Sequence, residues 1–365
     1  MEGIESEKIG VIGSGLAGLF LALELWERGA VPVIFCDKTN PFGASIAAQG
    51  VVSTKGLTKP EHPLFKLKLL GQRFLLDRLN YFSTKGLKYS ATRGVMEAYK
   101  DPAEYRDICR RVYRERYRGL YLTESINHYS GSHFPESVNF LRYRGDFWLD
   151  VPYLLQQIKV FLINNGVKFY HARVKDIKIG ASISIDSSIG GFLFDSCVVA
   201  SGASSDGLIP EVKLRSSLKK VGGSSLELPC DFKVSSFVSG AYSAHFSGKF
   251  ARIGSTTIKG DFRGKEKQCL ESLATVGRDR FSIPKSLIEN GRLISGNRCV
   301  TFDRKPLVGG FDDGRQNIYI LSGFHKSGLA LAPISAYHLA DKIAFGKESY
   351  LLEYCDPNYK AKTNT

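Results

Sequence analysis

Residues 8–37 read KIGVIGSGLAGLFLALELWERGAVPVIFCD, and this stretch decides the fold. Apolar residues predict a short buried strand over 8–12 and a second strand over 31–36. Between them, residues 16–28 form a helical stretch that is apolar nearly all round, and Gly29 is placed to end that helix. The N-terminus is therefore predicted to be a β-α-β unit, which builds parallel sheets covered by helices.

Three glycines in the turn before the predicted helix follow the G-x-G-x-x-G pattern. Gly13 permits a tight turn, Gly15 lets the backbone approach a pyrophosphate, and Gly18 allows the helix to pack closely on the strand. The helix N-terminus then directs its N–H groups at the phosphates. Asp37 ends the second strand, where a carboxylate accepts the hydroxyls of an adenosine ribose. These residues predict a dinucleotide site, and they do not distinguish FAD from NAD.

The composition is that of a globular protein with a sizeable core, since 43% of the 365 residues are hydrophobic. Lys and Arg outnumber Asp and Glu by 50 to 36, and the net charge of +14 favours a polyanionic partner such as RNA. Residues 110–118, RRVYRERYR, interleave arginines with tyrosines, which suits phosphate contacts and base stacking. A solvated helix face explains the same pattern, so this segment does not decide whether the protein binds RNA.

The seven cysteines are odd in number and scattered, with no C-x-x-C or other metal-ligand spacing. We therefore expect reduced thiols in a cytoplasmic protein, and no metal site. The apolar stretch 9–26 is interrupted by glycines, Ser14 and Glu24, and acidic residues precede it. From this stretch we expect neither a signal peptide nor a membrane span.

The rest of the chain alternates between parallel-sheet and antiparallel-sheet patterns. Helices are predicted over 63–82, 150–165 and 333–345, a strand over 167–170, and buried strands over 196–200 and 317–321. Residues 234–258 have the alternation of antiparallel strands, broken by glycines. We therefore predict an α/β fold whose nucleotide-binding domain is assembled from discontinuous segments.

Two further motifs narrow the choice of dinucleotide. The loop from Ser45 to Gly50 has the small and polar residues needed where a helix N-terminus approaches a cofactor. Near the C-terminus, residues 298–309 read RCVTFDRKPLVG, and the loop SGFHKSGLALAP follows at 322–333. Over nearly the whole chain these residues resemble the D-amino-acid oxidase superfamily of FAD enzymes. Within it, the chain is similar to glycine oxidases and to the FAD domain of enzymes that mature 5-carboxymethylaminomethyl-uridine in tRNA.

The resemblance implies a Rossmann-like FAD-binding domain of residues 1–85, 145–215 and 290–365. It also implies a discontinuous antiparallel-sheet substrate domain of residues 86–144 and 216–289. FAD is the implied cofactor. The residues that match the family's FAD site by position are Gly13, Gly15, Gly18, Asp37, Ser45, Ala48, Val174, Gly202, Gly323, Lys326, Ser327, Gly328 and Leu329.

Three residues are implied to act on the substrate. Arg298 would clamp a carboxylate, because the guanidinium fork matches that anion in two parallel hydrogen bonds. Tyr242 would cover the substrate beside the flavin, or else belong to the core. His325 would polarise the flavin ring, or else satisfy backbone carbonyls.

The chain departs from the family pattern in the substrate domain. Ala244-His245 stand where relatives often have Pro followed by a basic residue, and Gly222 replaces the usual basic residue before Gly223. We expect His245 to be a strand surface residue rather than a base. These departures affect the substrate assignment and leave the FAD assignment unchanged.

We therefore predict that the protein is an FAD-dependent oxidoreductase that acts on CH–NH or CH–NH2 groups and transfers a hydride to flavin N5. Its substrate is of the glycine, sarcosine or D-amino-acid type. One alternative is a flavoenzyme that removes a carboxymethyl group from a wobble uridine, which makes modified tRNA the partner. A second alternative is a non-catalytic flavin-binding subunit.

Overall fold

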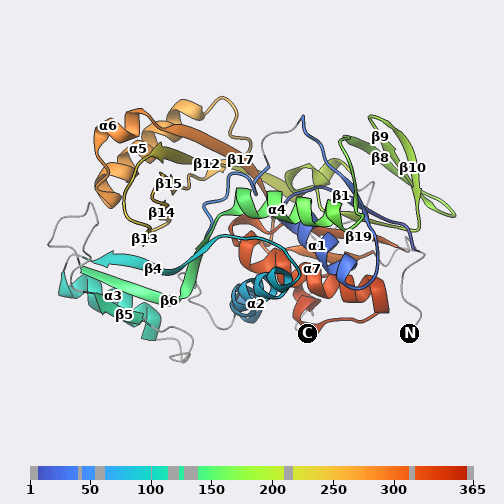
Figure 1. The fold of residues 1–365 in the computed structure, drawn as a ribbon, viewed down its shortest axis with the longest axis horizontal. Helices are drawn as coiled ribbons and strands as arrows, with labels where there is room; N and C mark the ends of the chain where they lie inside the picture. The colour runs from blue at the N-terminus through green and yellow to red at the C-terminus, as the bar shows by residue number, and fades with distance from the viewer. Residues whose placement is uncertain are drawn as a thin grey trace, which may run out of the picture.

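The protein is described by a computed structural model that covers residues 7–39, 43–53, 62–99, 101–113, 123–126, 139–208, 217–311 and 317–359. Figure 1 shows a sheet with α1, α2, α4 and α7 around it, and beside it a large sheet whose strands β12 to β15 lie next to α5 and α6. A small three-stranded sheet stands at the far end of the molecule, next to β1 and β19 (Figure 1).

The first sheet has six strands in the order β18-β19-β11-β1-β2-β7. Its pairs are parallel except for β18 with β19. The strands β1 and β11 are buried at every residue, as expected of strands covered on both faces. The bounds are β1 Ile9–Ile12, β2 Val33–Phe35, β7 Lys168–Tyr170, β11 Ser196–Val199, β18 Leu307–Gly310 and β19 Ile318–Ser322.

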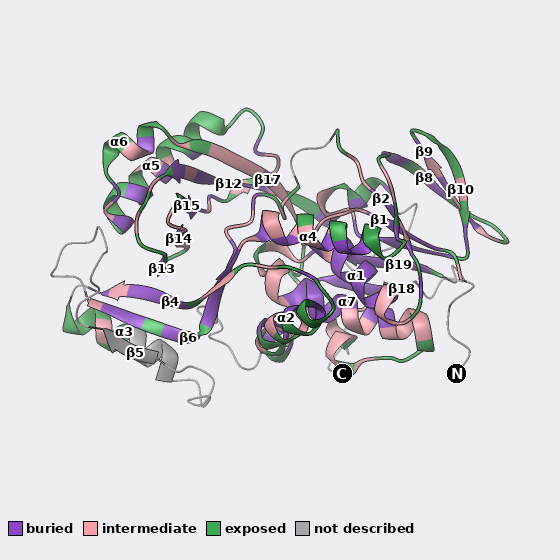
Figure 2. Cartoon of the chain, viewed as in Figure 1, coloured by how far each residue is buried: buried purple, intermediate pink, exposed green. Residues whose placement is uncertain are grey.

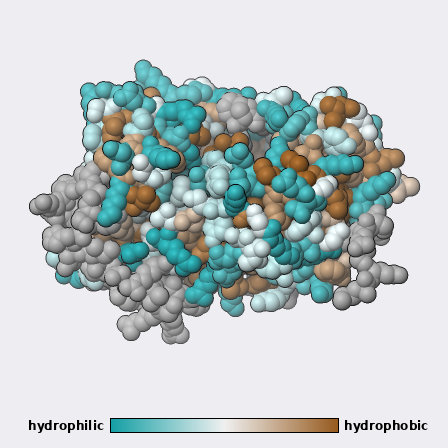
Figure 3. Space-filling model, in the orientation of Figure 1, coloured by the Kyte–Doolittle hydropathy of each residue, from teal (hydrophilic) through white to brown (hydrophobic). Residues whose placement is uncertain are grey.

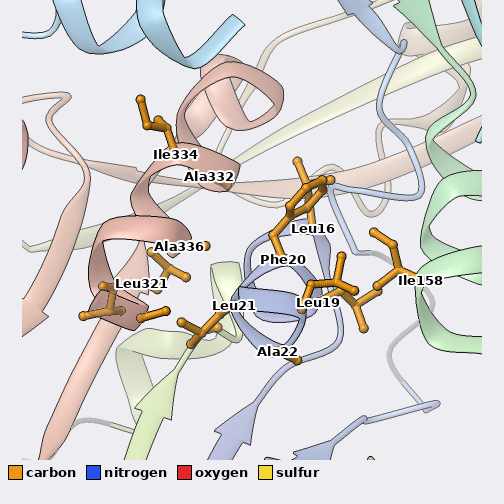
Figure 4. Close-up of a cluster of buried hydrophobic side chains, with 14 of the residues drawn as sticks. Leu16, Leu19, Phe20, Leu21, Ala22, Ile158, Leu321, Ala332, Ile334 and Ala336 are labelled. Carbon is orange, nitrogen blue, oxygen red and sulfur yellow. The ribbon is translucent and has the colours of Figure 1, made fainter. Parts of the chain in front are cut away.

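Four helices cover this sheet, and α1 is at their centre. They are α1 Leu16–Glu27, α2 Phe65–Thr84, α4 Val151–Asn164 and α7 Gly328–Phe345. Figure 4 shows how Leu16, Leu19 and Phe20 of α1 pack near Ile158 of α4 and Ala332 of α7. The buried apolar surface of these helices is the main stabilising contribution in this half of the molecule.

One buried carboxylate ties three of these helices together. Glu24 of α1 is fully buried and accepts hydrogen bonds from Arg28, at 2.9 Å, and from Arg78 of α2, at 2.7 Å for each of two nitrogens. Arg28 also donates to Asp341 of α7 at 2.8 Å. Because a buried charge is stable only when it is paired, this network fixes how α1, α2 and α7 dock.

The second sheet has ten strands and is mostly antiparallel. Eight of them follow the order β16-β12-β15-β14-β13-β4-β6-β3, while β17 pairs with β12 and β5 pairs with β6. Only β13 and β4 are parallel neighbours among these described strands. The bounds are β3 Val51–Val52, β4 Ala91–Tyr99, β5 Thr123–Ile126, β6 Asn139–Leu149, β12 Leu218–Pro229, β13 Ser235–Ser239, β14 Tyr242–Phe246, β15 Phe250–Gly254, β16 Ile258–Lys259 and β17 Arg292–Thr301.

The two faces of this sheet differ in chemistry. One face is apolar, with Phe237, Ala244 and Ile253 packed against Leu273 of α5 in a hydrophobic cluster. Figure 2 shows the corresponding split of α5 and α6 into buried and exposed sides. The opposite face is built mainly from serine, glycine and other small or polar residues, and it faces a cavity. The helices of this half are α3 Pro102–Tyr113, α5 Glu266–Phe281 and α6 Lys285–Glu289.

The third sheet joins β8 Val174–Ile179, β9 Ile183–Ser187 and β10 Gly190–Phe194. Ile179, Ile189 and Leu193 are exposed apolar residues of this sheet and its turn. Figure 3 shows hydrophobic residues, in brown, in several places among the hydrophilic residues of one face of the molecule. Short 3-10 turns complete the structure: η2 Gly202–Gly207, η3 His325–Ser327 and η4 Tyr350–Cys355. None of the described helices has the length and apolarity that a membrane span requires.

The predicted α/β fold is confirmed, and most element predictions match it closely. The helix predicted to begin at Pro333 instead begins at Gly328. Pro333 is the sixth residue of α7 and lies inside the helix, so it has no N–H to donate to the carbonyl oxygen of Leu329. The division into two domains stays a prediction: β6 crosses residue 145, and β17 lies beyond residue 290 in the large sheet.

The prediction for His245 is wrong. Its side chain is fully buried on the cavity side of β14, stacked on Trp148 with 3.5 Å between the ring centroids. Its Nδ1 lies 2.8 Å from the Ser236 hydroxyl. Burial, with the nearby charge of Arg252, lowers the pKa of His245 to about 3, so the ring is neutral at pH 7.

Candidate active site

A cavity of about 1620 Å³ runs between the parallel sheet and the polar face of the large sheet. This volume exceeds that of a site for one drug-sized ligand, roughly 300–1,000 Å³. Its walls come from the β1–α1 turn, the loop at 43–53, the start of α7 and strands of the large sheet that include β17, β12, β15, β14, β13, β4 and β6. The cavity therefore has room for a dinucleotide and a second molecule.

The glycines of the β1–α1 turn are required by close backbone contacts. Gly13 has a φ of +114°, and a Cβ there would lie 2.5 Å from the carbonyl oxygen of Ala200. A Cβ on Gly18 would lie 2.0 Å from the carbonyl oxygen of Gly13. Gly18 does not line the cavity, so its role is to let α1 pack on the turn.

The N-terminus of α1 opens into the cavity beside Ser45. No side chain caps the helix from Gly15, and the backbone N–H of Leu16 donates to Ser45 Oγ at 3.0 Å. A Cβ on Gly15 would lie 3.2 Å from the same oxygen. Such a helix end is a suitable site for an anionic phosphate.

Asp37 stands at the carboxyl end of the first sheet and also lines the cavity. Its Oδ1 accepts two hydrogen bonds from Thr39, one from the backbone N–H at 2.9 Å and one from the hydroxyl at 2.6 Å. These contacts hold the carboxylate at the end of β2, the position at which a ribose is bound in this kind of sheet.

The structure brings nearly all the predicted site residues to one cavity. Besides Gly18, the exception is Ser327, which is the N-cap residue of α7 and does not line the cavity. The predicted residues that do line it are Gly13, Gly15, Asp37, Ser45, Ala48, Val174, Gly202, Tyr242, Arg298, Gly323, His325, Lys326, Gly328 and Leu329.

The loop before α7 presents positive charge and a helix N-terminus to the cavity. His325 adopts a left-handed φ of +50°, and burial lowers its pKa to about 4, with the charges of Arg298 and Lys326 acting in the same direction. Burial also lowers the pKa of Lys326, and Arg298 adds to this effect. His325 is therefore neutral at pH 7.

Arg298 is a charged group of the cavity wall that is held by hydrogen bonds. Its Nη2 donates to Ser255 Oγ at 2.8 Å, and its Nη1 donates to the carbonyl oxygen of Thr256 at 3.2 Å. Burial lowers its pKa, and no described residue gives it a carboxylate partner. A largely buried guanidinium with only neutral acceptors is a site for an anion.

Gly222, which departs from the family pattern, and the following Gly223 both make room for neighbouring side chains. A Cβ on Gly223 would lie 2.2 Å from Arg298 Nη1, and a Cβ on Gly222 would lie 2.7 Å from Phe262 Cβ. A larger residue at 223 would displace the guanidinium. The position of Arg298 therefore depends on the absence of a side chain at Gly223.

Tyr242 lies at the rim. It begins β14 after the turn at Gly240, and the guanidinium of Arg280 lies 5.8 Å from its ring centroid. It lines the cavity while packing against the apolar cluster beneath α5.

Sequence reasoning missed a second polar group of the cavity. Glu97 of β4 and Tyr143 of β6 both line it, and both are only 4% exposed. Tyr143 Oη donates to Glu97 Oε2 at 2.6 Å. Glu97 lies in a mixed, arginine-rich stretch of the sequence. No local sequence pattern predicts its strand or its hydrogen bond with Tyr143.

The residues present fit FAD. The β1–α1 turn excludes side chains and leaves a helix N-terminus facing the cavity, and Asp37 is in place for a ribose. Within the described part of the chain, no three His, Cys, Asp or Glu side chains are grouped to hold a metal ion. The side chains of the arginine-rich segment 110–118 lie outside the described residues.

Comparisons with known proteins agree with this arrangement. The family described as DAO, FAD dependent oxidoreductase, matches residues 8–342. Glycine oxidase of Geobacillus kaustophilus (strain HTA426) is 23% identical over 351 residues, 92% of either chain. The crystal structure of glycine oxidase from Geobacillus kaustophilus has a TM-score of 0.82 at 20% identity, over 98% of this chain and all of the other. Iminodiacetate oxidase from Chelativorans sp. BNC1 has a TM-score of 0.82 at 18% identity, over 97% of this chain and all of the other.

Proposed function

This chain belongs to the DAO family of FAD-dependent oxidoreductases, and from that premise we propose that it oxidises a small amino-acid-like substrate of the glycine, sarcosine or D-amino-acid type. The cofactor is FAD, and the reaction acts on a C–N bond. When bound, FAD accepts at N5 the hydride that leaves the substrate. The protein's own contribution is to bind and orient the substrate and to control its charge.

Arg298 carries the proposal. Its guanidinium faces the cavity from β17, and His325 lies close enough for the charge of Arg298 to lower the pKa of the imidazole. We infer that the substrate carboxylate binds Arg298 in two parallel hydrogen bonds, which fixes the adjacent carbon. The amine then has a defined position relative to the start of α7.

His325 and Tyr242 have supporting roles in this proposal. The neutral imidazole of His325 offers a hydrogen bond beside the reacting atoms without adding a further positive charge. Tyr242 closes the rim of the cavity, where an amphipathic ring limits access of water. The FAD contacts we propose are those of the β1–α1 turn, Asp37, the Ser45 loop and the start of α7.

Anaerobic reduction of the yellow protein tests the proposed substrate class. Purified FAD-loaded protein is mixed with glycine, sarcosine, D-alanine or undermodified tRNA, and bleaching of the flavin band is followed. We expect rapid bleaching by at least one small amino acid. Bleaching by tRNA alone would replace this proposal with the wobble-uridine reading, which rests on the +14 charge and the arginine-rich segment.

A further inference from the structure

The cavity opens to solvent where the strands β2 and β7 end. These strands are parallel neighbours in the first sheet, and Phe35 of β2 pairs with Tyr170 of β7. Lys38 follows Phe35 by three residues, and Arg173 follows Tyr170 by three residues. Both Lys38 and Arg173 are exposed, and both line the cavity. Because adjacent strands are about 4.8 Å apart, these two cations are neighbours at the opening.

Lys175 adds a third cation to the same opening. It is exposed and lines the cavity, two residues beyond Arg173. Burial and the charges of Lys159 and Lys38 lower the pKa of His171, which precedes Arg173 by two residues. The charge of Lys38 therefore reaches the chain segment that carries the other two cations.

We call Lys38, Arg173 and Lys175 the entrance cations. Within the part of the chain that the structure describes, none of them forms a salt bridge. The carboxylate beside them, Asp37, accepts two hydrogen bonds from Thr39. The entrance therefore carries more positive than negative charge. Exposed cations attract an anionic ligand before contact, over a Debye length of about 8–10 Å at ordinary salt concentrations.

The phosphate-binding turn lies within that range. The N–H of Gly13 donates to the carbonyl oxygen of Phe35 at 2.9 Å, so the β1–α1 turn is next to the end of β2. In the sheet order β7 is two strands from β1, which is roughly 10 Å. The N-terminus of α1 is the site for the pyrophosphate of FAD. The negative charge of FAD is concentrated in this ADP half, since the oxidised flavin ring is neutral.

We propose that the entrance cations steer FAD into the cavity with its ADP half leading. They act on the association rate, because they are exposed and attract the pyrophosphate through solvent. The contacts that retain bound FAD are those of the β1–α1 turn, Asp37, the Ser45 loop and the start of α7. This inference concerns the binding of FAD alone and holds for any substrate that the enzyme oxidises.

Release of FAD from the loaded protein measures the association rate. Diluting the FAD-loaded protein gives koff from the rise of flavin fluorescence and Kd from its plateau, and kon is koff divided by Kd. We expect kon of the wild type to fall steeply between about 0.01 M and about 1 M salt, as the Debye length falls from about 30 Å to about 3 Å. The change in koff should be smaller.

Substitutions assign this salt dependence to the entrance cations. The entrance variant, Lys38→Ser with Arg173→Ser and Lys175→Ser, should have a roughly 10-fold lower kon at about 0.01 M salt, the low end of the range for electrostatic steering. Its salt dependence should be flatter, and its koff should stay within about two-fold of the wild type. The matched control removes the same charge at exposed positions that do not line the cavity: Lys249→Ser, Lys267→Ser and Arg278→Ser. The unfolding midpoint checks that both variants are folded.

Two results overturn the steering. One is an equal kon at low salt for the entrance variant and the matched control. The other is a loss of affinity that appears in koff alone, because the three side chains would then act as contacts of bound FAD.

ADP tests which half of FAD leads. In the wild type at low salt, added ADP should compete with FAD and raise the fluorescence plateau. The entrance variant should need roughly 10-fold more ADP for the same effect, because ADP then loses the same steering as FAD. An ADP requirement equal to that of the wild type would overturn entry by the ADP half.

Discussion

Replacing Arg298 by alanine tests the proposed carboxylate site, and the structure sets the size of the effect. In the free protein the guanidinium donates to two carbonyl oxygens and one hydroxyl, and it has no carboxylate partner among the described residues. A substrate carboxylate would convert it into a desolvated, charge-assisted pair. Losing one partner of such a pair costs about 2–5 kcal/mol, a fall of roughly 30- to several-thousand-fold in kcat/KM.

The same variant should have little effect on folding. Arg298 makes only hydrogen bonds to neutral groups, and burial already opposes its charge, as its lowered pKa indicates. Removing it relieves that desolvation and leaves space above Gly223. We therefore expect the free energy of unfolding of Arg298→Ala to change by less than about 1 kcal/mol. A residue with a mainly structural role would show the opposite pattern, with stability lost first.

The assay is stopped-flow reduction of the bound flavin by the best small amino acid of the panel. Arg298→Lys should recover little, because an ammonium is a point charge and lacks the planar fork. The flavin absorbance of each variant confirms that FAD is bound. An Arg298→Ala protein with an intact flavin spectrum and near-native kcat/KM would place the carboxylate site elsewhere in the cavity.

Three further predictions concern the cofactor, the helix core and pH. Gly15→Val should weaken FAD binding by roughly 1–3 kcal/mol, the usual cost of overpacking, because a Cβ at this position would already lie 3.2 Å from Ser45 Oγ. Fluorescence titration of the apoprotein with FAD measures the Kd, and an unchanged Kd would refute this prediction. Glu24→Gln should lower the free energy of unfolding in urea by about 3 kcal/mol, since Arg28 and Arg78 lose their buried counter-charge; an unchanged urea midpoint would contradict it. The pKa of His245 is about 3 when folded and 6.5 when free, so the unfolded chain binds one more proton between these values and stability falls as pH drops through that window. In His245→Gln, the pH dependence of the free energy of unfolding should decrease by the contribution of about one bound proton. Equal pH dependence in the variant and the wild type would refute the assignment to His245.

Much of the cofactor-binding half follows from short-range sequence patterns. The β-α-β unit over 8–37 folds as predicted, because an apolar strand, a G-x-G-x-x-G turn and an apolar helix are each defined within a few residues. Asp150 caps α4 as its sequence indicates, accepting a hydrogen bond from the N–H of Tyr153 at 3.1 Å. The motif at 298–309 led through its family resemblance to Arg298, which lines the cavity.

The end of the cavity at Glu97 has no comparable local sequence signal. Glu97 reaches it because β4 pairs with β13, a strand about 140 residues later in the chain, in a register that places Glu97 beside Val238. His245 is buried for a related reason: β6 brings Trp148 over its ring, although alternation along β14 alone left that face open to solvent. Strand register is set by long-range packing of whole faces, and a shift by one residue would turn each of these side chains to the opposite side. The cofactor-binding turn and the helix ends could therefore be predicted from the sequence, whereas the positions of Glu97 and His245 depend on which distant strands pair.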